Sequence, residues 1–476
     1  MENYKYDVKS SKAEEFINDG EINDTLKYAS ENKTNRTLIK SIIEKARERK
    51  GLNHREAAVL LDCELEDLNQ EMFELAREIK QKIYGNRIVM FAPLYLSNYC
   101  VNGCVYCPYH AKNKTICRKK LTQEQVRAET IALQDMGHKR LALEAGEDPV
   151  NNPLEYILEC IDTIYSIKHK NGAIRRVNVN IAATTVENYK RLKDAGIGTY
   201  ILFQETYNKE NYLNLHPTGP KHDYAYHTEA MDRAMQGGID DVGCGVLFGL
   251  NLYRYDFVGL LMHAEHLEAA FGVGPHTISV PRICPADDID VEDFSNAVSD
   301  EIFQKIIAVI RIAVPYTGMI ISTRESQKSR EKALQLGISQ ISGASSTSVG
   351  GYVEKETDEN NTAQFDRSDT RTLYEVLNWL LELGYIPSFC TACYRQGRTG
   401  DRFMPLAKSG AIQNCCQPNA LLTLKEYLED YASKDTKIKG DKVIAAEVKK
   451  IPNDKVRETT IDYLDKIVHG SRDFRF

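Results

Sequence analysis

Three cysteines in the first quarter of the chain have a spacing that suits an iron–sulfur cluster. Cys100, Cys104 and Cys107 are arranged as C-x3-C-x2-C within SNYCVNGCVYCPY. Three thiolates bound to a cubane of four irons leave one iron without a protein ligand. A structural zinc site needs a fourth ligand, and the nearest candidates, His110 and Cys117, are not at the usual spacing. The pattern therefore favours a cubane with one open iron over a closed zinc site.

A second group of cysteines lies near the end of the sequence. Cys390 and Cys393 form C-x2-C, and Cys416 extends the pattern to C-x2-C-x22-C. Zinc bound by these three residues and Cys415 is the alternative, but ligands at adjacent positions strain tetrahedral geometry. The zinc alternative is therefore disfavoured here as well.

The composition fits an ordinary globular protein and excludes several partners. The chain has 476 residues, 42% of them hydrophobic and 27% charged, a net charge of -7 and 12 cysteines. This excludes collagen-like and wholly disordered chains, and the acidic balance gives no reason to expect nucleic acid or a membrane. The sequence MENYKYDVKSSKAEEF has no signal-peptide pattern, so we expect a cytoplasmic protein. Cysteines in a reducing compartment are not expected to form a disulfide framework.

Short apolar runs alternate with helical segments through the middle of the chain, which is typical of βα units around a parallel sheet. Eight such runs begin at Arg87, Lys139, Arg175, Gly198, Asp241, His276, Gly318 and Ser339. Helical segments between them include 122–136, 185–195 and 300–314, which we expect to end at Gly137, Gly196 and Gly318. Eight repeats favour a (β/α)8 barrel of the TIM type over an open doubly wound sheet.

The barrel is expected to lie between two helical extensions. Residues 1–85 are predicted to form a helical N-terminal extension, with a capping box at Asn53 and Glu56 and an end at Gly85. The barrel is assigned to residues 86–385 and a C-terminal segment with the second cysteine group to 386–476. Residues after the eighth helix begin at the bottom of a barrel, so the two cysteine groups should lie at opposite mouths, on the order of 20 Å apart.

The first cysteine loop, at the end of the first barrel strand and with Tyr106 before its last cysteine, resembles that of the radical S-adenosylmethionine (SAM) superfamily. The resemblance implies a 4Fe-4S cluster whose open iron binds SAM, which one-electron reduction cleaves to a deoxyadenosyl radical. It also implies an electron donor such as ferredoxin or flavodoxin. In the run LEAGEDP, Glu144, Gly146 and Glu147 stand where that family holds the SAM amino group, and Tyr106 completes the expected SAM-binding set.

The barrel combined with C-x2-C-x22-C, and the runs IYGNRIV, GPHTISVPR and CTACYRQGRTGDRFM, resembles the HydG family of FeFe-hydrogenase maturases. This resemblance implies cleavage of the L-tyrosine Cα–Cβ bond to p-cresol and dehydroglycine. It further implies conversion of dehydroglycine to carbon monoxide and cyanide at a second 4Fe-4S cluster, held by Cys390, Cys393 and Cys416 and carrying an additional iron. The other maturases, HydE and HydF, are the partners expected by family analogy.

Several residues outside the cysteine groups are expected to bind substrate. Arg324, after the seventh strand, has a fork suited to a carboxylate, unless it pairs with Glu325 instead. Ser342, Ser345 and Arg282 also follow strands and are assigned to the substrate with it. Gln204 and Glu205, at the end of the fourth strand, line the pocket or its rim.

A histidine is expected to hold the additional iron that the family resemblance implies. His276 opens the sixth strand at the bottom mouth, which makes it the preferred candidate. His263 and His266 lie within the preceding helix and are expected on its outer, solvent-exposed face.

Two alternative functions remain open at this point. The thiazole-pathway tyrosine lyase, 2-iminoacetate synthase, performs the same first cleavage without a second cluster, so the C-terminal cysteines count against it. A non-catalytic iron–sulfur scaffold or electron carrier needs no SAM pocket, so LEAGEDP and the complete barrel count against that class.

Overall fold

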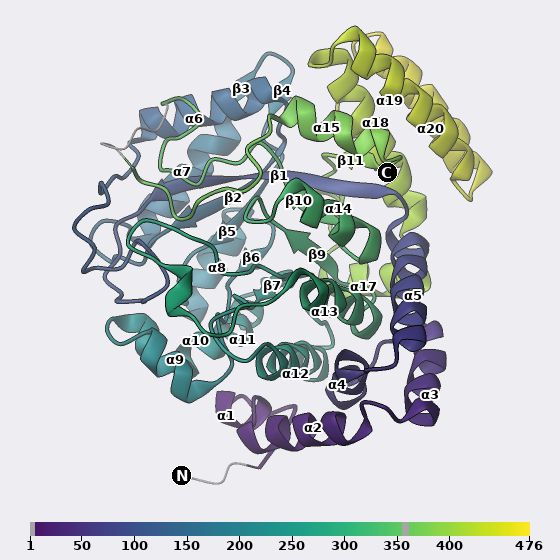
Figure 1. Ribbon diagram of the computed structural model, residues 1–476. Helices are drawn as coiled ribbons and strands as arrows, with labels where there is room; N and C mark the ends of the chain where they lie inside the picture. The colour runs from purple at the N-terminus through teal and green to yellow at the C-terminus, as the bar shows by residue number, and fades with distance from the viewer. Residues whose placement is uncertain (1–4, 355–360) are drawn as a thin grey trace.

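A closed parallel barrel forms the centre of the computed structural model, which describes residues 5–354 and 361–476 (Figure 1). Its strands are β1 (Arg87–Ser97), β2 (Arg140–Ala145), β5 (Arg176–Asn180), β6 (Tyr200–Ile201), β7 (Val242–Gly245), β8 (Thr277–Ser279), β9 (Gly318–Ile321) and β10 (Gln340–Ser342). They pair in this order, and β1 closes the circle by pairing with β10, with Val89 opposite Gln340. The predicted (β/α)8 fold and all eight strands are confirmed.

Helices alternate with the strands and surround the barrel. They are α6 (Gln123–Met136), α7 (Leu154–Ser166), α8 (Val186–Asp194), α9 (Lys209–Leu215), α10 (Tyr224–Thr228), α11 (Ala230–Gln236), α12 (Tyr253–Phe271), α13 (Asp300–Ala313), α14 (Gln327–Leu336) and α15 (Leu373–Glu382). A small hairpin of β3 (Lys168–His169) and β4 (Gly172–Ala173) lies outside the barrel. Thr122 and Thr372 start α6 and α15 with capping boxes, so these boundaries are fixed by local sequence.

Two of the three predicted glycine helix ends are confirmed. Gly137 and Gly196 have positive φ angles, 102° and 77°, directly after α6 and at the end of α8. The prediction for Gly318 is wrong, because α13 ends at Ala313 and Gly318 is the first residue of β9. A Cβ atom at Gly318 would lie 2.3 Å from the side-chain amide nitrogen of Gln340, so this glycine makes room for a neighbour inside the barrel.

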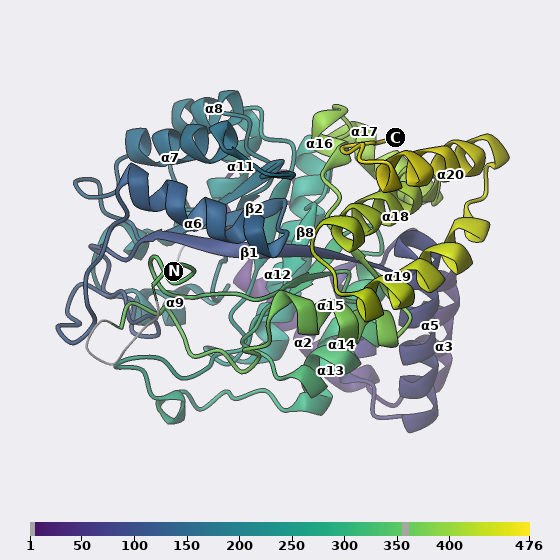
Figure 2. The same cartoon turned by 90° about the horizontal axis from the view of Figure 1, so that it is seen from above.

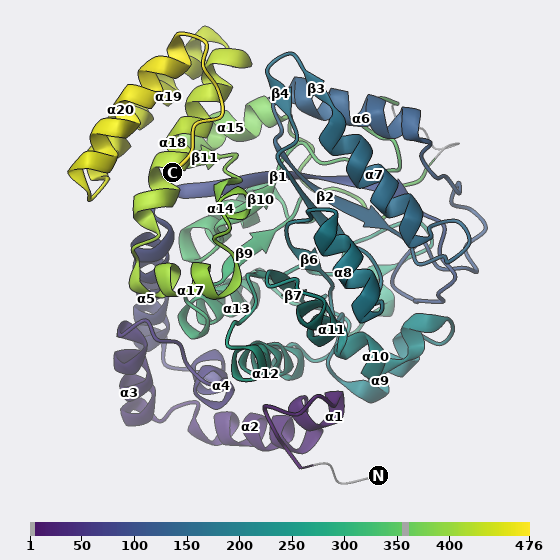
Figure 3. The same cartoon turned by 180° about the vertical axis from the view of Figure 1, so that it is seen from behind.

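Five helices precede the barrel, as the sequence predicts, and follow one side of it (Figures 1 and 3). They are α1 (Ala13–Phe16), α2 (Asp19–Asn32), α3 (Arg36–Arg47), α4 (His54–Asp62) and α5 (Glu66–Tyr84). The capping box of Asn53 and Glu56 at the start of α4 is present. No helix within residues 5–354 and 361–476 is long and apolar enough to cross a membrane.

The expected exposure of His263 and His266 is wrong, because α1 covers that face of α12. Both side chains are buried. The ring of Phe16 stacks on that of His266 at 3.8 Å between centroids, and Nε2 of His266 lies 2.9 Å from a carboxylate oxygen of Asp232. Both histidines therefore help to attach the N-terminal helices to the barrel.

The C-terminal segment begins with a strand that the sequence does not reveal. β11 (Ile386–Ser388) pairs with the start of β1, with Arg87 opposite Ile386, and is followed by α16 (Ala392–Arg395), α17 (Gly400–Ser409), α18 (Gln413–Asp430), α19 (Lys434–Glu447) and α20 (Asp454–Val468). Figure 2 shows α18 to α20 on the side opposite the loops that follow β1.

The length of β1 sets the distance between the two cysteine groups. The first group follows the end of β1, whereas the second follows β11 beside its start, as the barrel topology predicts. β11 runs parallel to β1 with Ser388 opposite Val89, so the second group follows a point near the start of β1 and only part of this eleven-residue strand separates the two groups. The separation on the order of 20 Å stays a prediction.

His54 joins the N-terminal helices to the barrel through two carboxylates. Its Nδ1 lies 2.8 Å from Oε2 of Glu265 on α12, and its Nε2 lies 2.9 Å from Oε1 of Glu21 on α2. Burial alone would lower the pKa of His54, but the two glutamates outweigh it and raise that pKa. The protonated imidazole can donate to both carboxylates, so protonation and folding are linked.

We expect His54→Gln to lower the free energy of unfolding by about 1–3 kcal/mol at pH 6. The contribution of the charged His54 is complete below its unfolded pKa of about 6.5 and is lost as the pH rises through the raised folded pKa. The difference from wild type should therefore shrink at higher pH, measured by urea unfolding at pH 6 and pH 9. His469→Gln, on an exposed helix end, is the control. A difference that is constant with pH would contradict the linkage.

Candidate functional site

The first three cysteines line a cavity of about 1120 Å³ at the end of the barrel where the strands finish. Its lining includes Cys100, Cys104, Cys107 and the predicted residues Tyr106, Glu144, Gly146, Glu147 and Arg324. The structure therefore brings the first cysteine group, the predicted SAM-binding residues and one predicted substrate residue to a single cavity. We call this the upper cavity.

The thiols of this group are suited to a cationic metal cluster. Burial raises the pKa of Cys104 to about 11 and that of Cys107 to about 12, so thiolates here need a positive partner. Among the described residues, no three His, Cys, Asp or Glu side chains gather closely enough to share one metal ion. In a cubane each cysteine binds a different iron, so such close grouping is not required. The donor set fits an iron–sulfur cluster.

The glycine of LEAGEDP brings the end of β2 against the cysteine loop. A Cβ atom at Gly146 would lie 2.4 Å from the carbonyl oxygen of Tyr99 and 3.0 Å from Cβ of Cys100. The side chain of Asn152 donates to the carbonyl oxygens of Tyr99 and Gly146 at 2.9 and 2.8 Å. The absence of a side chain at Gly146 therefore lets the end of β2 pack against the loop that carries Cys100.

Two glutamates of this run line the upper cavity, and burial raises the pKa of both. Burial raises the pKa of Glu144 to about 8, against a hydrogen bond from Asn180 and the charge of Arg324. Glu147 accepts a hydrogen bond of 2.7 Å from Asn102, although burial raises its pKa too. A ligand ammonium group beside Glu144 would therefore gain an ion pair by ionising this carboxyl group.

Tyr106 is held in place by neighbours that the sequence does not point to. Its hydroxyl lies 2.7 Å from Nε2 of His216, and the ammonium nitrogen of Lys221 lies 5.7 Å from the centre of its ring. Lys221 pairs with Glu205 at 2.9 Å, and both line the upper cavity. Gln204, by contrast, is buried and donates to Thr228.

Arg118 closes the cysteine loop and was missed by the sequence analysis. Its guanidinium donates to the carbonyl oxygens of Asn98, Tyr109 and His110 at 2.7, 2.9 and 2.7 Å. The first of these precedes Cys100 and the other two follow the last cysteine, so one side chain ties both ends of the loop. The run CRKK reads as an exposed basic stretch and carries no signal of this role.

A second cavity of about 720 Å³ continues into the barrel and is called the middle cavity. It shares Glu144 and Arg324 with the upper cavity and adds Ser342 and Ser345, whose hydroxyl oxygens are buried with no hydrogen-bond partner among the described residues. Arg324 donates to the sulfur of Cys284 at 3.2 Å and its guanidinium lies 3.7 Å from the centre of the Phe365 ring. The fork of Arg324 thus faces a cavity.

The expected substrate contact of Arg282 does not agree with its position. Arg282 does not line the upper or middle cavity among the described residues. Its guanidinium is already bound by Glu325 at 2.8 Å and by Asp300 at 2.9 Å. Glu325, which could have paired with Arg324, pairs with Arg282 instead, so the guanidinium of Arg282 is not free to bind a substrate carboxylate.

The second cysteine group lines a cavity of about 610 Å³ at the opposite end of the barrel, called the lower cavity. Its lining includes Cys390, Cys393, Cys416 and His276, together with Arg87, Arg140 and Arg176. Burial raises the pKa of Cys390 to about 11, and the hydrogen bond between Cys393 and Cys416 raises the pKa of the former and lowers that of the latter. Three buried thiols can bind an iron–sulfur core as thiolates, and the neighbouring arginines would balance the negative charge of those thiolates.

His276 faces the same cavity and lies beside a carboxylate that the sequence does not point to. Nδ1 of His276 lies 3.5 Å from Oδ1 of Asp241, which is buried. Burial lowers the pKa of His276 to about 4, so the imidazole is neutral at pH 7, the form that binds metal. A carboxylate beside a histidine ligand is a common arrangement around metals.

Two family models match the chain. The model described as the Radical SAM superfamily matches residues 94–261, and the model of the Biotin and Thiamin Synthesis associated domain matches residues 279–386. The first match contains all three cysteines of the upper cavity.

Known proteins resemble the chain over different shares of its length. It is 59% identical to HydG, a maturase of the FeFe-hydrogenase, over 97% of this chain and 100% of that chain, with a TM-score of 0.94. It is 40% identical to the FeFe-hydrogenase maturase HydG from Carboxydothermus hydrogenoformans, over 95% and 99% of the chains, with a TM-score of 0.82. The 2-iminoacetate synthase of Salmonella typhimurium is 29% identical over 346 residues, 72% of this chain and 89% of the relative.

We expect Arg118→Lys to reduce occupancy of the upper cluster about 10-fold, because one ammonium group cannot bind the carbonyl oxygens at both ends of the loop. Iron content and the change that SAM causes in the electron paramagnetic resonance spectrum measure the occupancy. Arg127→Lys, on the exposed side of α6, is the control. Normal iron content with an unchanged response to SAM in Arg118→Lys would show that the loop does not depend on this side chain.

Proposed function

Because this chain belongs to the HydG family of FeFe-hydrogenase maturases, we propose that it is a radical SAM lyase that cleaves L-tyrosine to p-cresol and dehydroglycine. In this proposal, dehydroglycine is then converted to carbon monoxide and cyanide, which are used to assemble the hydrogenase cofactor. The observation that carries the proposal is the presence of two cysteine-lined cavities at opposite ends of one barrel. Two chemically distinct steps need two such sites.

The upper cavity would hold the first cluster and SAM. Bound at Cys100, Cys104 and Cys107, a 4Fe-4S cluster supplies the electron that converts SAM to a deoxyadenosyl radical. Glu144 and Glu147 face the cavity and offer carboxylates to an ammonium group. Tyr106 and Gly146 fix the shape of the loop through the contacts described above. These residues would bind and orient the cofactor.

The middle cavity would hold the substrate. The fork of Arg324 can bind the tyrosine carboxylate through two parallel hydrogen bonds. The hydroxyls of Ser342 and Ser345, which have no hydrogen-bond partner within residues 5–354 and 361–476, are available to the same polar end of the substrate. Because this cavity shares Glu144 and Arg324 with the upper one, a substrate bound here lies beside the SAM site.

The lower cavity would receive dehydroglycine. In this proposal Cys390, Cys393 and Cys416 hold a second 4Fe-4S cluster and His276 holds an additional iron. Arg140, whose Nε is buried without a partner among the described residues, gives the lower cavity a positive charge suited to a carboxylate. Within this proposal HydE and HydF are the partner maturases, and a ferredoxin or flavodoxin supplies the electron.

The two alternatives are less well supported. The match to 2-iminoacetate synthase covers 72% of this chain at 29% identity, whereas the HydG match covers 97% at 59% and so includes most of the segment after Tyr385. A scaffold or electron carrier has no need for a cavity lined by Arg324, Ser342 and Ser345 beside a radical SAM site.

We expect substitutions in the two cysteine groups to affect different steps, tyrosine cleavage for the first group and carbon monoxide formation for the second. With SAM, dithionite and tyrosine under anaerobic conditions, Cys104→Ala should abolish both p-cresol and carbon monoxide, whereas Cys393→Ala should retain p-cresol and lose carbon monoxide. Chromatography measures p-cresol, and haemoglobin binding measures carbon monoxide. Cys117→Ala, an exposed cysteine outside both groups, is the control. The tyrosine-lyase proposal fails if the wild type makes no p-cresol, and the division of labour fails if Cys393→Ala still releases carbon monoxide.

We expect Arg324→Gln to raise the KM for tyrosine about 10-fold or more, because a charged hydrogen bond contributes about 1.5–3 kcal/mol. Initial rates of p-cresol formation at varied tyrosine concentration measure the effect. Arg282→Gln is a matched control, because this arginine lies nearby but contacts Glu325 and Asp300 instead of the cavity. Equal KM values for wild type and Arg324→Gln would remove Arg324 from the substrate site.

A further inference from the structure

We propose that Asp473 is a positioning residue for the second cysteine group, because it fastens both helices that carry these cysteines to the base of the barrel. This inference rests on the proposed function for the second cluster that these cysteines would hold and for its activity readout. The contacts of Asp473 come from α16, from α18 and from the barrel.

The side chain of Asp473 holds the helix of Cys393. Its two carboxylate oxygens accept hydrogen bonds of 2.6 Å each from Nη1 and Nη2 of Arg395, a bidentate pair. Arg395 is the last residue of α16, two positions after Cys393. This helix has only four residues and no side-chain cap at its start, so it depends on contacts of this kind to keep its position.

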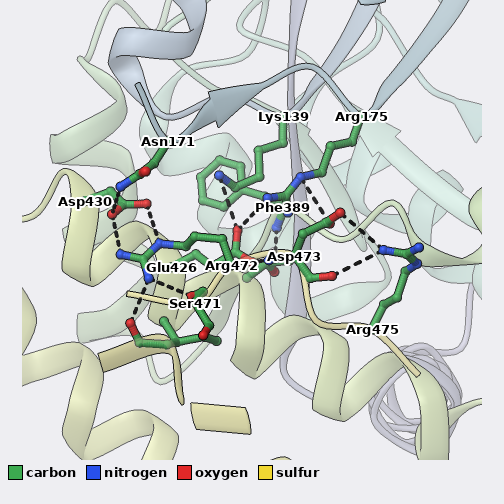
Figure 4. A network of polar contacts seen from close by, with 12 residues as sticks. Lys139, Asn171, Arg175, Phe389, Glu426, Asp430, Ser471, Arg472, Asp473 and Arg475 are labelled. Atoms are coloured by element: carbon green, nitrogen blue, oxygen red, sulfur yellow. Dashed lines mark hydrogen bonds and ion pairs between the residues drawn. The ribbon is translucent and has the colours of Figure 1, made fainter. Parts of the chain in front are cut away.

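The backbone of Asp473 holds the helix of Cys416. Its N–H donates to Oε1 of Glu426 at 2.6 Å, and Glu426 lies on α18, the helix that contains Cys416 (Figure 4). The side chain of Glu426 is fully buried, so its charge requires partners. Asp473 therefore contributes a donor to a carboxylate that cannot be solvated.

The barrel itself is the third participant. Arg175, directly before β5, forms ion pairs with Glu426 at 2.9 Å and with Asp473 at 3.3 Å. Lys139, directly before β2, lies 3.4 Å from Glu426. Figure 4 shows Lys139 and Arg175 directed toward Glu426 and Asp473. Both cations stand at the lower ends of barrel strands, so the network joins the barrel to the helices of the second cysteine group.

The segment around Asp473 is fixed on both sides. Arg472 forms a hydrogen bond of 2.9 Å with Asp430, and the N–H of Phe476 donates to the side chain of Asn419 at 2.9 Å. Asp473 has a φ angle of 69°, a region that non-glycine residues rarely adopt. These anchors keep Asp473 in a conformation in which its side chain and its backbone N–H serve different helices.

The consequence is specific to the lower cavity. A cubane requires its three thiolates at fixed separations, and Cys393 and Cys416 reach it from separate helices. Loss of Asp473 would release α16 from α18 and from the barrel. The upper cavity lies at the other end of β1 and shares none of these contacts. Tyrosine cleavage should therefore continue while the lower cluster loses occupancy.

The test uses the reconstituted full chain with Asp473→Ala, Asp473→Glu and Arg395→Gln. We expect Asp473→Ala to lower the ratio of carbon monoxide to p-cresol about 10-fold, the lower end of the range for residues that support metal ligands. Asp473→Glu should recover part of this ratio, since it retains the carboxylate. Asp462→Ala, which removes an exposed α20 carboxylate paired with Lys466, is the matched control.

Electron paramagnetic resonance provides a readout that does not depend on turnover. In a Cys104→Ala background the spectrum reports the lower cluster, and we expect Asp473→Ala to reduce its spin yield and alter its g values. A wild-type spectrum together with a wild-type product ratio would overturn the proposal. If Asp473→Ala also loses p-cresol, the spectrum of Arg395→Gln tests the proposal, because this variant removes only the contact with α16 and leaves the contact between Asp473 and Glu426 intact. A normal lower-cluster spectrum in Arg395→Gln would then overturn the proposal. Absence of p-cresol in the wild type would overturn the proposed function alone, since the spectrum still tests Asp473.

Discussion

The pairing of β1 with β10 is the constraint on which the rest of the structure depends. It closes the barrel, and because β1 is unusually long its first half pairs with β10 while its second half pairs with β2. The start of β1 also pairs with β11, outside the barrel. One strand therefore leads from the beginning of the second cysteine site to the beginning of the first. Both sites are positioned by the same backbone, and neither can shift along the barrel without disturbing this ladder.

Burial and neighbouring charges determine which ligands the two ends of the barrel can bind. The pKa values of four thiols, Cys104, Cys107, Cys390 and Cys393, are raised, whereas that of Cys416 is lowered, so the protein alone does not favour a full set of thiolates. The neighbours differ, however. Carboxyl groups such as Glu144 face the upper cavity, whereas arginines such as Arg140 and Arg176 face the lower one. The same barrel thus offers one end suited to a cationic ligand and one suited to an anionic ligand.

Local patterns in the sequence predict much of this arrangement. The eight strands, the capping boxes and the opposite placement of the cysteine groups follow from periodicity, caps and chain direction. Features that arise from distant parts of the chain do not. The burial of His266 depends on Phe16, which is far away in sequence, and β11 is a three-residue strand whose partner is β1. Arg282 and Arg324 follow neighbouring strands and cannot be distinguished until Glu325 is seen to bind Arg282.

The residues that hold the two cysteine groups in place also differ in how far along the sequence they lie from the cysteines. Arg118 lies eleven positions after Cys107, whereas Asp473 lies eighty positions after Cys393. Chains emerge from the ribosome from the N-terminus, and units fold as they become available. Arg118 can thus close the first cysteine loop from a short stretch of new chain, whereas the second group of cysteines is synthesised well before Asp473. The second group therefore gains its support later in synthesis than the first.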